Sequence, residues 1–199
     1  MKLFHTINSP YARRARMAVR ESGLSGQVEE IEIIREENND LLFEQGPGGK
    51  VPGLLTDSGT YLCESLTIAR YLDEVSGGKL YPADPAAREF ALYVESVASL
   101  LMDSLYVRAA ENRRDPSEQS PGLIEKEAAR AARCYDELAG LVERFDGQVS
   151  MDKATVVASL GYADWRHPGD GWRDGRPKLA AWFEEMMKRP AMADTKPIF

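Results

Sequence analysis

The sequence is poor in the residues that build metal centres and disulfide frameworks. Its 199 residues include only two cysteines, Cys63 and Cys134, and two histidines, His5 and His167. The cysteines are far apart and form no Cys-x-x-Cys pair, which argues against dithiol redox chemistry within one chain. Because cysteine and histidine are so scarce, no zinc-finger pattern is present, and we expect no metal site.

Basic charge is also in deficit. The chain has 25 Lys and Arg against 32 Asp and Glu, which gives a formal net charge of −7. This balance argues against nucleic acid or an anionic membrane surface as the main partner. We see no signal peptide and no apolar run long enough to span a membrane. We therefore expect a cytoplasmic, reducing location.

The first part of the chain predicts a mixed α/β layer. Hydrophobic residues make up 43% of the sequence, enough to bury a core. Apolar and polar residues alternate in two strand-like segments, and between these segments the apolar residues have the spacing of a helix. The predicted order is strand-helix-strand-helix-strand-strand-helix, over residues 2–6, 10–22, 28–34, 41–43, 51–55, 61–63 and 65–76. Asn38-Asn39-Asp40 is expected to cap the short second helix.

The rest of the chain reads as helical. Residues 77–85 are rich in glycine and proline, so we place a domain boundary there. This gives an N-terminal domain over 1–77, a linker over 78–85 and a helical domain over 86–199. Asp146-Gly147 is expected to break its second helix. The expected helices cover residues 86–113, 123–145, 154–165 and 177–188.

One stretch, residues 46–65, has the features of a small-ligand site. A glycine-rich loop leads to Val51-Pro52, then to a predicted hairpin, and finally to Glu64-Ser65 at the start of a helix. Helix N-termini expose free amides that suit an anion, and the Glu64 carboxylate suits an ammonium group. The zwitterionic end of an amino acid would satisfy both groups.

The ordered set of Val51-Pro52, hairpin and Glu64-Ser65 resembles the glutathione S-transferase family. The resemblance covers nearly the whole chain. It implies a thioredoxin-like N-terminal domain, an all-helical C-terminal domain, glutathione as co-substrate and a homodimer. In the second half, Ser150-Met151-Asp152-Lys153 stands where the family usually has a Ser/Thr-x-x-Asp capping box. Since Lys153 replaces the acid, we expect an incomplete cap.

Ser9 is the catalytic residue that the resemblance implies. The family places its catalytic Ser, Tyr or Cys at the start of the first helix, and this chain has Ser9-Pro10-Tyr11 there. A hydroxyl that donates to a charged acceptor contributes about 1.5–3 kcal/mol and a helix N-terminus adds roughly 0.3–1 kcal/mol, which together suffice to lower the pKa of a thiol by about two units. Ser9 is also a good N-cap ahead of Pro10, and one hydroxyl can serve both purposes.

The resemblance assigns the other glutathione contacts. The Val51 backbone is expected to pair with the cysteinyl unit, with Pro52 in the cis form. Glu64 is expected to meet the γ-glutamyl ammonium and Ser65 its carboxylate. Lys50 is either a contact of the glycyl carboxylate or a solvated loop lysine.

The pocket for the second substrate is less defined. By position in the family its candidates are Tyr11, Met102, Tyr106 and the tail Ile198-Phe199, although such residues at helical spacing are more often core. Asp103 is a candidate contact of a partner subunit's glutathione. Arginines at 13, 14, 16 and 20 read as a solvated or interface face of the first helix.

The two cysteines are expected to be small buried hydrophobes. The alternative for Cys63 is a mixed disulfide with glutathione, but family members with thiol-transferase activity carry cysteine at the position of Ser9. The resemblance as a whole implies a cytoplasmic, detoxifying transferase that conjugates glutathione to a small hydrophobic electrophile. The alternatives are glutathione-dependent isomerase, dehalogenase or ether-cleaving chemistry on the same site, or a non-catalytic protein-interaction module.

Overall fold

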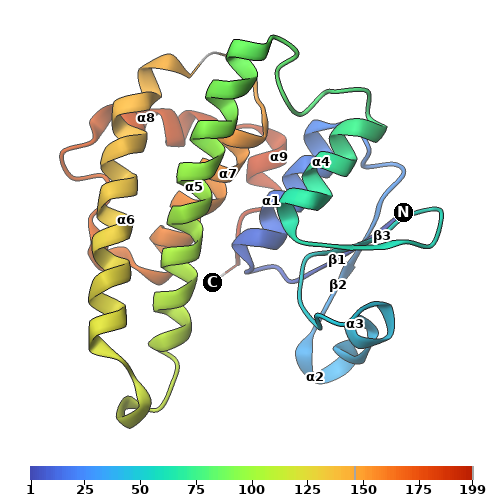
Figure 1. Ribbon diagram of the computed structural model, residues 1–199, viewed down its shortest axis with the longest axis horizontal. Coiled ribbons are helices and arrows are strands. Elements are labelled where there is room, and N and C mark those ends of the chain that lie inside the picture. Colours follow the sequence, from blue (N-terminus) through green and yellow to red (C-terminus); the bar gives the residue numbers. More distant parts are fainter. Residues whose placement is uncertain (146, 199) are drawn as a thin grey trace.

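The computed structural model describes residues 1–145 and 147–198. The expectations that involve Asp146 and Phe199 lie outside these residues. Within them the chain forms an α/β layer followed by a helical bundle, which confirms the predicted fold class (Figure 1). The proposed boundary at 77/78 falls between helices α4 and α5, and as a domain boundary it stays a prediction.

A four-stranded sheet with the order β2-β1-β3-β4 organises the α/β half. β1 pairs parallel with β2 and antiparallel with β3, and β3 and β4 form the predicted hairpin. Alternation along β1 sends Leu3 to one face and Phe4 to the other, and each joins a different apolar cluster. The strands are β1 (Lys2–His5), β2 (Glu29–Glu32), β3 (Gly53–Leu55) and β4 (Tyr61–Cys63).

Helices cover both faces of this sheet. α1 (Pro10–Glu21) and α4 (Ser65–Val75) pack together over the face of Leu3, next to the helical half. On the face of Phe4 the structure has two short helices, α2 (Arg35–Asn38) and α3 (Asp40–Gln45), where one was predicted (Figure 1). The predicted cap at 38–40 is wrong in detail, because Asn39 makes no side-chain cap bond to α3.

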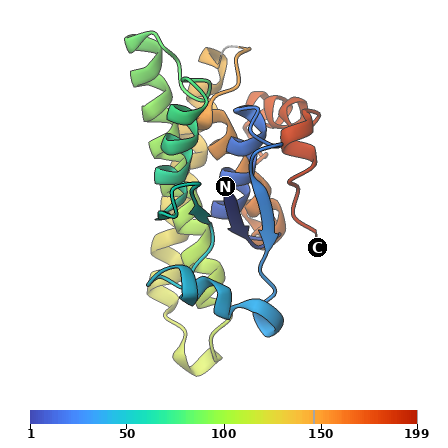
Figure 2. The ribbon, with the colours of Figure 1, turned by 90° about the vertical axis from the view of Figure 1, so that its right-hand side faces the viewer.

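The helical half is built around α7 (Met151–Arg166), which is buried from Met151 to Ala163. It starts three residues earlier than the predicted residue 154. As expected, the cap at Ser150 is incomplete, since that hydroxyl bonds to Asp152 and not to a helix amide. Around it lie α5 (Pro85–Glu111), α6 (Pro121–Leu141), α8 (Pro177–Met186) and a short α9 (Pro190–Ala193) that the sequence pattern did not reveal (Figure 2).

Helix α5 corrects one expectation about membranes. By length and apolar composition alone, α5 is able to cross a membrane, whereas the sequence was expected to contain no apolar segment long enough to do so. Half of its apolar window is buried within the protein, where α5 packs against α6 and α7. A long core helix passes the same test.

Two of the four arginines of α1 also differ from expectation, because Arg13 and Arg14 are only 1% and 3% exposed. Arg13 donates to the carbonyls of Val157 and Met192 at 3.4 and 3.1 Å, and so ties α1 to α7 and to α9. Burial lowers the pKa of its guanidinium to about 10. Gly161 makes the room, since a Cβ there would lie 2.3 Å from Nη1 of Arg13.

Candidate functional site

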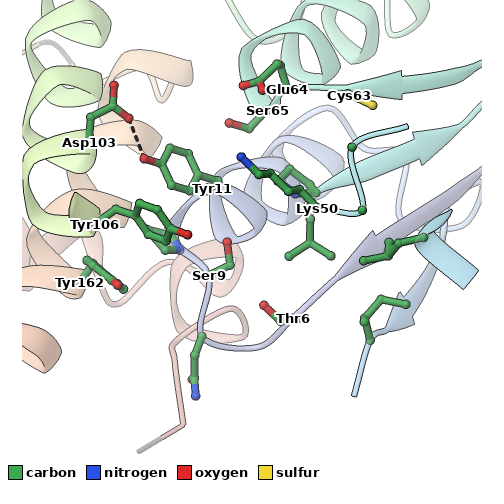
Figure 3. Close-up of a pocket in the computed structure, with 18 of the residues that line it drawn as sticks. Thr6, Ser9, Tyr11, Lys50, Cys63, Glu64, Ser65, Asp103, Tyr106 and Tyr162 are labelled. Carbon is green, nitrogen blue, oxygen red and sulfur yellow. Dashed lines mark hydrogen bonds between the residues drawn. The ribbon is translucent and has the colours of Figure 1, made fainter. Parts of the chain in front are cut away.

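A cleft of about 760 Å³ lies between the α/β half and helices α5 and α7. One wall comes from the ends of β1, β3 and β4 and the starts of α1 and α4, and the other from α5 and α7. Figure 3 shows side chains from both walls pointing toward one open space. Most of the site residues expected from the sequence line this cleft: Ser9, Tyr11, Lys50, Val51, Pro52, Glu64, Ser65 and Tyr106.

Ser9 caps α1 at the edge of the cleft. Its Oγ accepts the amide N–H of Ala12 at 3.2 Å, and Pro10 occupies the first helical position, as the sequence predicts. The bond to Ala12 uses the oxygen as an acceptor, so the hydroxyl hydrogen is left to donate into the cleft. Helix capping and contact with a sulfur atom are therefore compatible.

The peptide bond between Val51 and Pro52 is cis, as predicted. Val51 and Pro52 both line the cleft, directly ahead of β3. Lys50 precedes them on an exposed loop, and its amine points toward the cleft (Figure 3). The loop requires glycine at Gly49, where φ is +52° and a Cβ would lie 2.4 Å from the ring of Phe43.

Glu64 and Ser65 open α4, as expected, and both face the cleft (Figure 3). Glu64 is exposed and has φ +67° and ψ 120°, a conformation that costs a residue with a side chain about 1–3 kcal/mol. This turn redirects the chain from β4 into the helix and brings the carboxylate to the rim. Ser65 is 2% exposed and stands at the helix N-terminus, where free amides favour an anion.

Arg14 lies behind Ser65, and sequence reasoning missed it. Its Nε and Nη2 donate to Oγ of Ser65 at 3.2 and 2.6 Å, and its Nη1 donates to Oγ of Ser99 on α5 at 2.9 Å. Burial lowers the pKa of Arg14, although the nearby Glu95 opposes this effect. Because both bonds to Ser65 use the oxygen as acceptor, the Ser65 hydroxyl hydrogen is directed toward another acceptor. The helical periodicity did indicate that Arg14 is buried, because Arg14 and the buried Ala18, four residues later, lie on the same face of α1.

Tyr11 and Tyr106 meet at the α5 side of the cleft. Their rings pack edge to face with centroids 5.6 Å apart, and the Tyr11 hydroxyl donates to Oδ1 of Asp103 at 2.6 Å. Burial and then the bond to Asp103 raise the pKa of Tyr11. The placement of Met102 in this pocket is wrong: Met102 is 0% exposed and points into the core between the helices, whereas Asp103 and Tyr106 share the face of α5 that borders the cleft.

Cys63 is not the buried hydrophobe that was expected. It is exposed and lines the cleft, because alternation along β4 turns Leu62 to the core and Tyr61 and Cys63 to the opposite face. Cys134 is buried, as predicted, and burial raises the pKa of its thiol.

The far end of the cleft contains residues that the sequence did not single out. Arg113 follows α5, and Tyr162, Trp165 and Arg166 come from the last turns of α7. The guanidinium carbon of Arg166 lies 3.5 Å from the centroid of the Trp165 ring. The tail residue Ile198 is exposed and does not line this cleft. Because these residues belong to separate segments of the chain, no local sequence motif predicts that they meet in the cleft.

The comparisons with known proteins point to one family. The family model "Glutathione S-transferase, N-terminal domain" matches residues 8–75. A curated relative from Escherichia coli (strain K12), the uncharacterized GST-like protein YibF, is 27% identical over 99% of this chain and 98% of its own.

Solved structures agree over the full length. A glutathione transferase family member from Pseudomonas fluorescens Pf-5, with bound S-(propanoic acid)-glutathione, is 30% identical, with a TM-score of 0.88 and complete coverage of both chains. A glutathione S-transferase from Methylobacillus flagellatus KT, with glutathione bound, is 27% identical, with a TM-score of 0.91 over 99% of each chain.

Proposed function

Since this chain belongs to the glutathione S-transferase family, we propose that it binds glutathione in the cleft and conjugates it to a small hydrophobic electrophile. The observation that carries the proposal is the convergence of Ser9, Val51, Glu64 and Ser65 on one space. The solved relatives with glutathione or a glutathione conjugate bound support it.

Each of these residues offers the chemistry that one part of glutathione needs. Glu64 provides a carboxylate for the γ-glutamyl ammonium, and Ser65 provides a hydroxyl and a helix amide for its carboxylate. The backbone of Val51 lies directly ahead of β3, where it can pair with an extended peptide in the manner of a strand. Lys50 is placed for the glycyl carboxylate. The sulfur atom then comes to the N-terminus of α1.

Ser9 is the residue that we propose stabilises the thiolate. Its hydroxyl hydrogen is available to donate, and the N-terminus of α1 adds a favourable field of roughly 0.3–1 kcal/mol. Tyr11 is a weaker candidate, because its hydroxyl already donates to Asp103 and its pKa is raised by burial and by that carboxylate. Ser9 donates a hydrogen bond and forms no covalent bond in this scheme.

The biological setting follows from the family as part of the same proposal. We propose a cytoplasmic homodimer that acts in detoxification. In such a dimer Asp103, which is exposed and lines the cleft, is the acidic group that we propose contacts the partner subunit's glutathione. Analytical ultracentrifugation tests the dimer, and a monomer at micromolar concentration would contradict it.

Calorimetric titration with glutathione tests the site. We expect the wild-type protein to bind and the double variant Glu64→Ala, Ser65→Ala to lose at least 100-fold in affinity, because both ends of the amino-acid group lose their partners. The matched control is Glu74→Ala, Ser76→Ala, which removes the same side-chain types near the opposite end of α4. Thermal melts establish that each variant is folded. Absence of wild-type binding at millimolar glutathione would favour the interaction module.

A further inference from the structure

We propose that the electrophile carries a carboxylate, and that Arg113 and Arg166 bind it at the far end of the cleft while Tyr106 and Tyr162 contact its apolar body. This inference rests on the proposed function and narrows it from a small hydrophobic compound to an acidic one. It gives a role to two arginines that the glutathione contacts leave unused.

Arg166 is built into the wall of the cleft. Its guanidinium carbon lies 3.5 Å from the centroid of the Trp165 ring, and this stacking fixes the plane of the group beside the cleft. Its Nε is buried and has no hydrogen-bond partner among the described residues. A carboxylate in the cleft would accept from the donors of this guanidinium that face the open space.

Arg113 approaches the same place from the end of α5. Burial raises the pKa of Tyr162, and the positive charges of Arg166 and Arg113 both oppose that shift, so both arginines act on this one phenol. Arg113 is exposed and lines the cleft. In the described part of the chain, neither arginine takes part in a charge pair with Asp or Glu at 4.0 Å or less.

The other charges of the cleft leave this end positive. Glu64 and Lys50 belong to the opposite, glutathione end. Asp103 is closer, but it accepts the hydroxyl of Tyr11 at 2.6 Å and so directs part of its charge to that bond (Figure 3). An arginine pair beside aromatic rings suits a planar acid, since a guanidinium fork matches the two oxygens of a carboxylate.

The chemistry of conjugation is compatible with such a substrate. The thiolate sulfur bonds to the electrophilic carbon of an unsaturated acid, the electron pair of the double bond moves to the neighbouring carbon, and that carbon takes a proton from water. No oxidant or reductant is needed. The carboxylate stays bound to the arginines and is unchanged in the product.

Binding of two matched glutathione derivatives tests the inference without turnover. The probes are S-(4-carboxybenzyl)glutathione and S-(4-carbamoylbenzyl)glutathione, which have the same size and differ in charge. We expect the wild type to bind the acid about tenfold more tightly than the amide, since only the acid forms charge-assisted hydrogen bonds with the arginines and solvent screens part of that gain. The double variant Arg113→Gln, Arg166→Gln is expected to bind the two probes equally.

Two further variants separate the possible outcomes. Arg133→Gln, an exposed arginine of α6 outside the cleft, is a control for net charge and should keep the tenfold preference. Arg113→Lys, Arg166→Lys should restore part of it. Equal wild-type affinity for acid and amide would overturn the carboxylate subsite while leaving the glutathione site intact. Failure of the wild type to bind glutathione or either derivative would instead overturn the proposed function.

Discussion

The two ends of the cleft are built in different ways. The glutathione end uses backbone features of the α/β half: a cis peptide bond at Val51-Pro52, a turn with positive φ at Glu64 and the N-termini of α1 and α4. The far end uses side chains, which come from Tyr106 on α5 and from the last turns of α7. Backbone features need a fixed local sequence, whereas a set of side chains can change one residue at a time.

Under the proposed function, this difference separates recognition of glutathione from the choice of the second substrate. Few substitutions at the glutathione end would keep the turn at Glu64 and the N-termini of α1 and α4. At the far end, a change of Arg113 or Arg166 alters charge and leaves the fold in place, because both stand at helix ends. Variants at each end of the cleft test this difference.

The largest expected effect is at Arg14, which supports the glutathione end from behind. Arg14→Met leaves the buried hydroxyl of Ser65 and the half-buried hydroxyl of Ser99 without their donor, and we expect the free energy of unfolding to fall by about 3 kcal/mol. Glutathione affinity should fall as well. Urea unfolding and calorimetry measure the two effects, and Arg133→Met is the control. Unchanged affinity in a folded Arg14→Met protein would mean that Ser65 needs no support.

Ser9→Ala should lower kcat/KM roughly 10- to 100-fold, because a hydroxyl bond to a charged sulfur is lost. It should also remove an N-cap worth about 1 kcal/mol. Ser120→Ala is the matched control, since Ser120 caps α6 ahead of Pro121 through a bond to Leu123 and is exposed. Equal losses of turnover in the two variants would reduce Ser9 to a helix cap.

Acid should weaken the sheet beneath the glutathione end. Burial lowers the pKa of His5 to about 4 from its ordinary 6.5, and the charge of Arg16 acts in the same direction. The unfolded chain therefore takes up a proton first, so stability is present above pH 6.5 and is lost as the pH falls from 6.5 through 4. We expect the free energy of unfolding to fall by about 2 kcal/mol between pH 7.5 and 4.5. Urea unfolding at each pH should show that the free energy of unfolding falls less steeply with acid in His5→Asn than in the wild type. The same dependence on pH in both proteins would exclude His5 as the cause.

The smallest expected effect is at Tyr11, which borders both ends. Tyr11→Phe removes the bond to Asp103 and exposes that carboxylate to the cleft. We expect a two- to fivefold weaker preference for the acidic glutathione derivative, equivalent to less than about 1 kcal/mol. Thiol activation should be unchanged. A large loss of turnover would show that Tyr11, rather than Ser9, assists the sulfur.

The sequence allowed the glutathione end to be predicted because its determinants are local. Ser9 before Pro10 defines a helix start, and Val51-Pro52 with Glu64-Ser65 defines a hairpin between a loop and a helix. Prediction failed for Met102, Cys63 and the buried arginines. There, orientation depends on which helix or strand face meets the rest of the protein. Only tertiary packing of α1 on α4, α7 and α9 decides that Arg13 and Arg14 are covered.

The central claim is that Ser9 stabilises the glutathione thiolate, and the pKa of the bound thiol tests it most directly. Ultraviolet difference spectra of the wild-type complex, recorded against pH, report the thiolate. We predict a pKa for the bound thiol about one to two units below its ordinary value of about 8.5, and a return toward that value in Ser9→Ala. The same pKa in both proteins, with glutathione bound in each, would contradict the account.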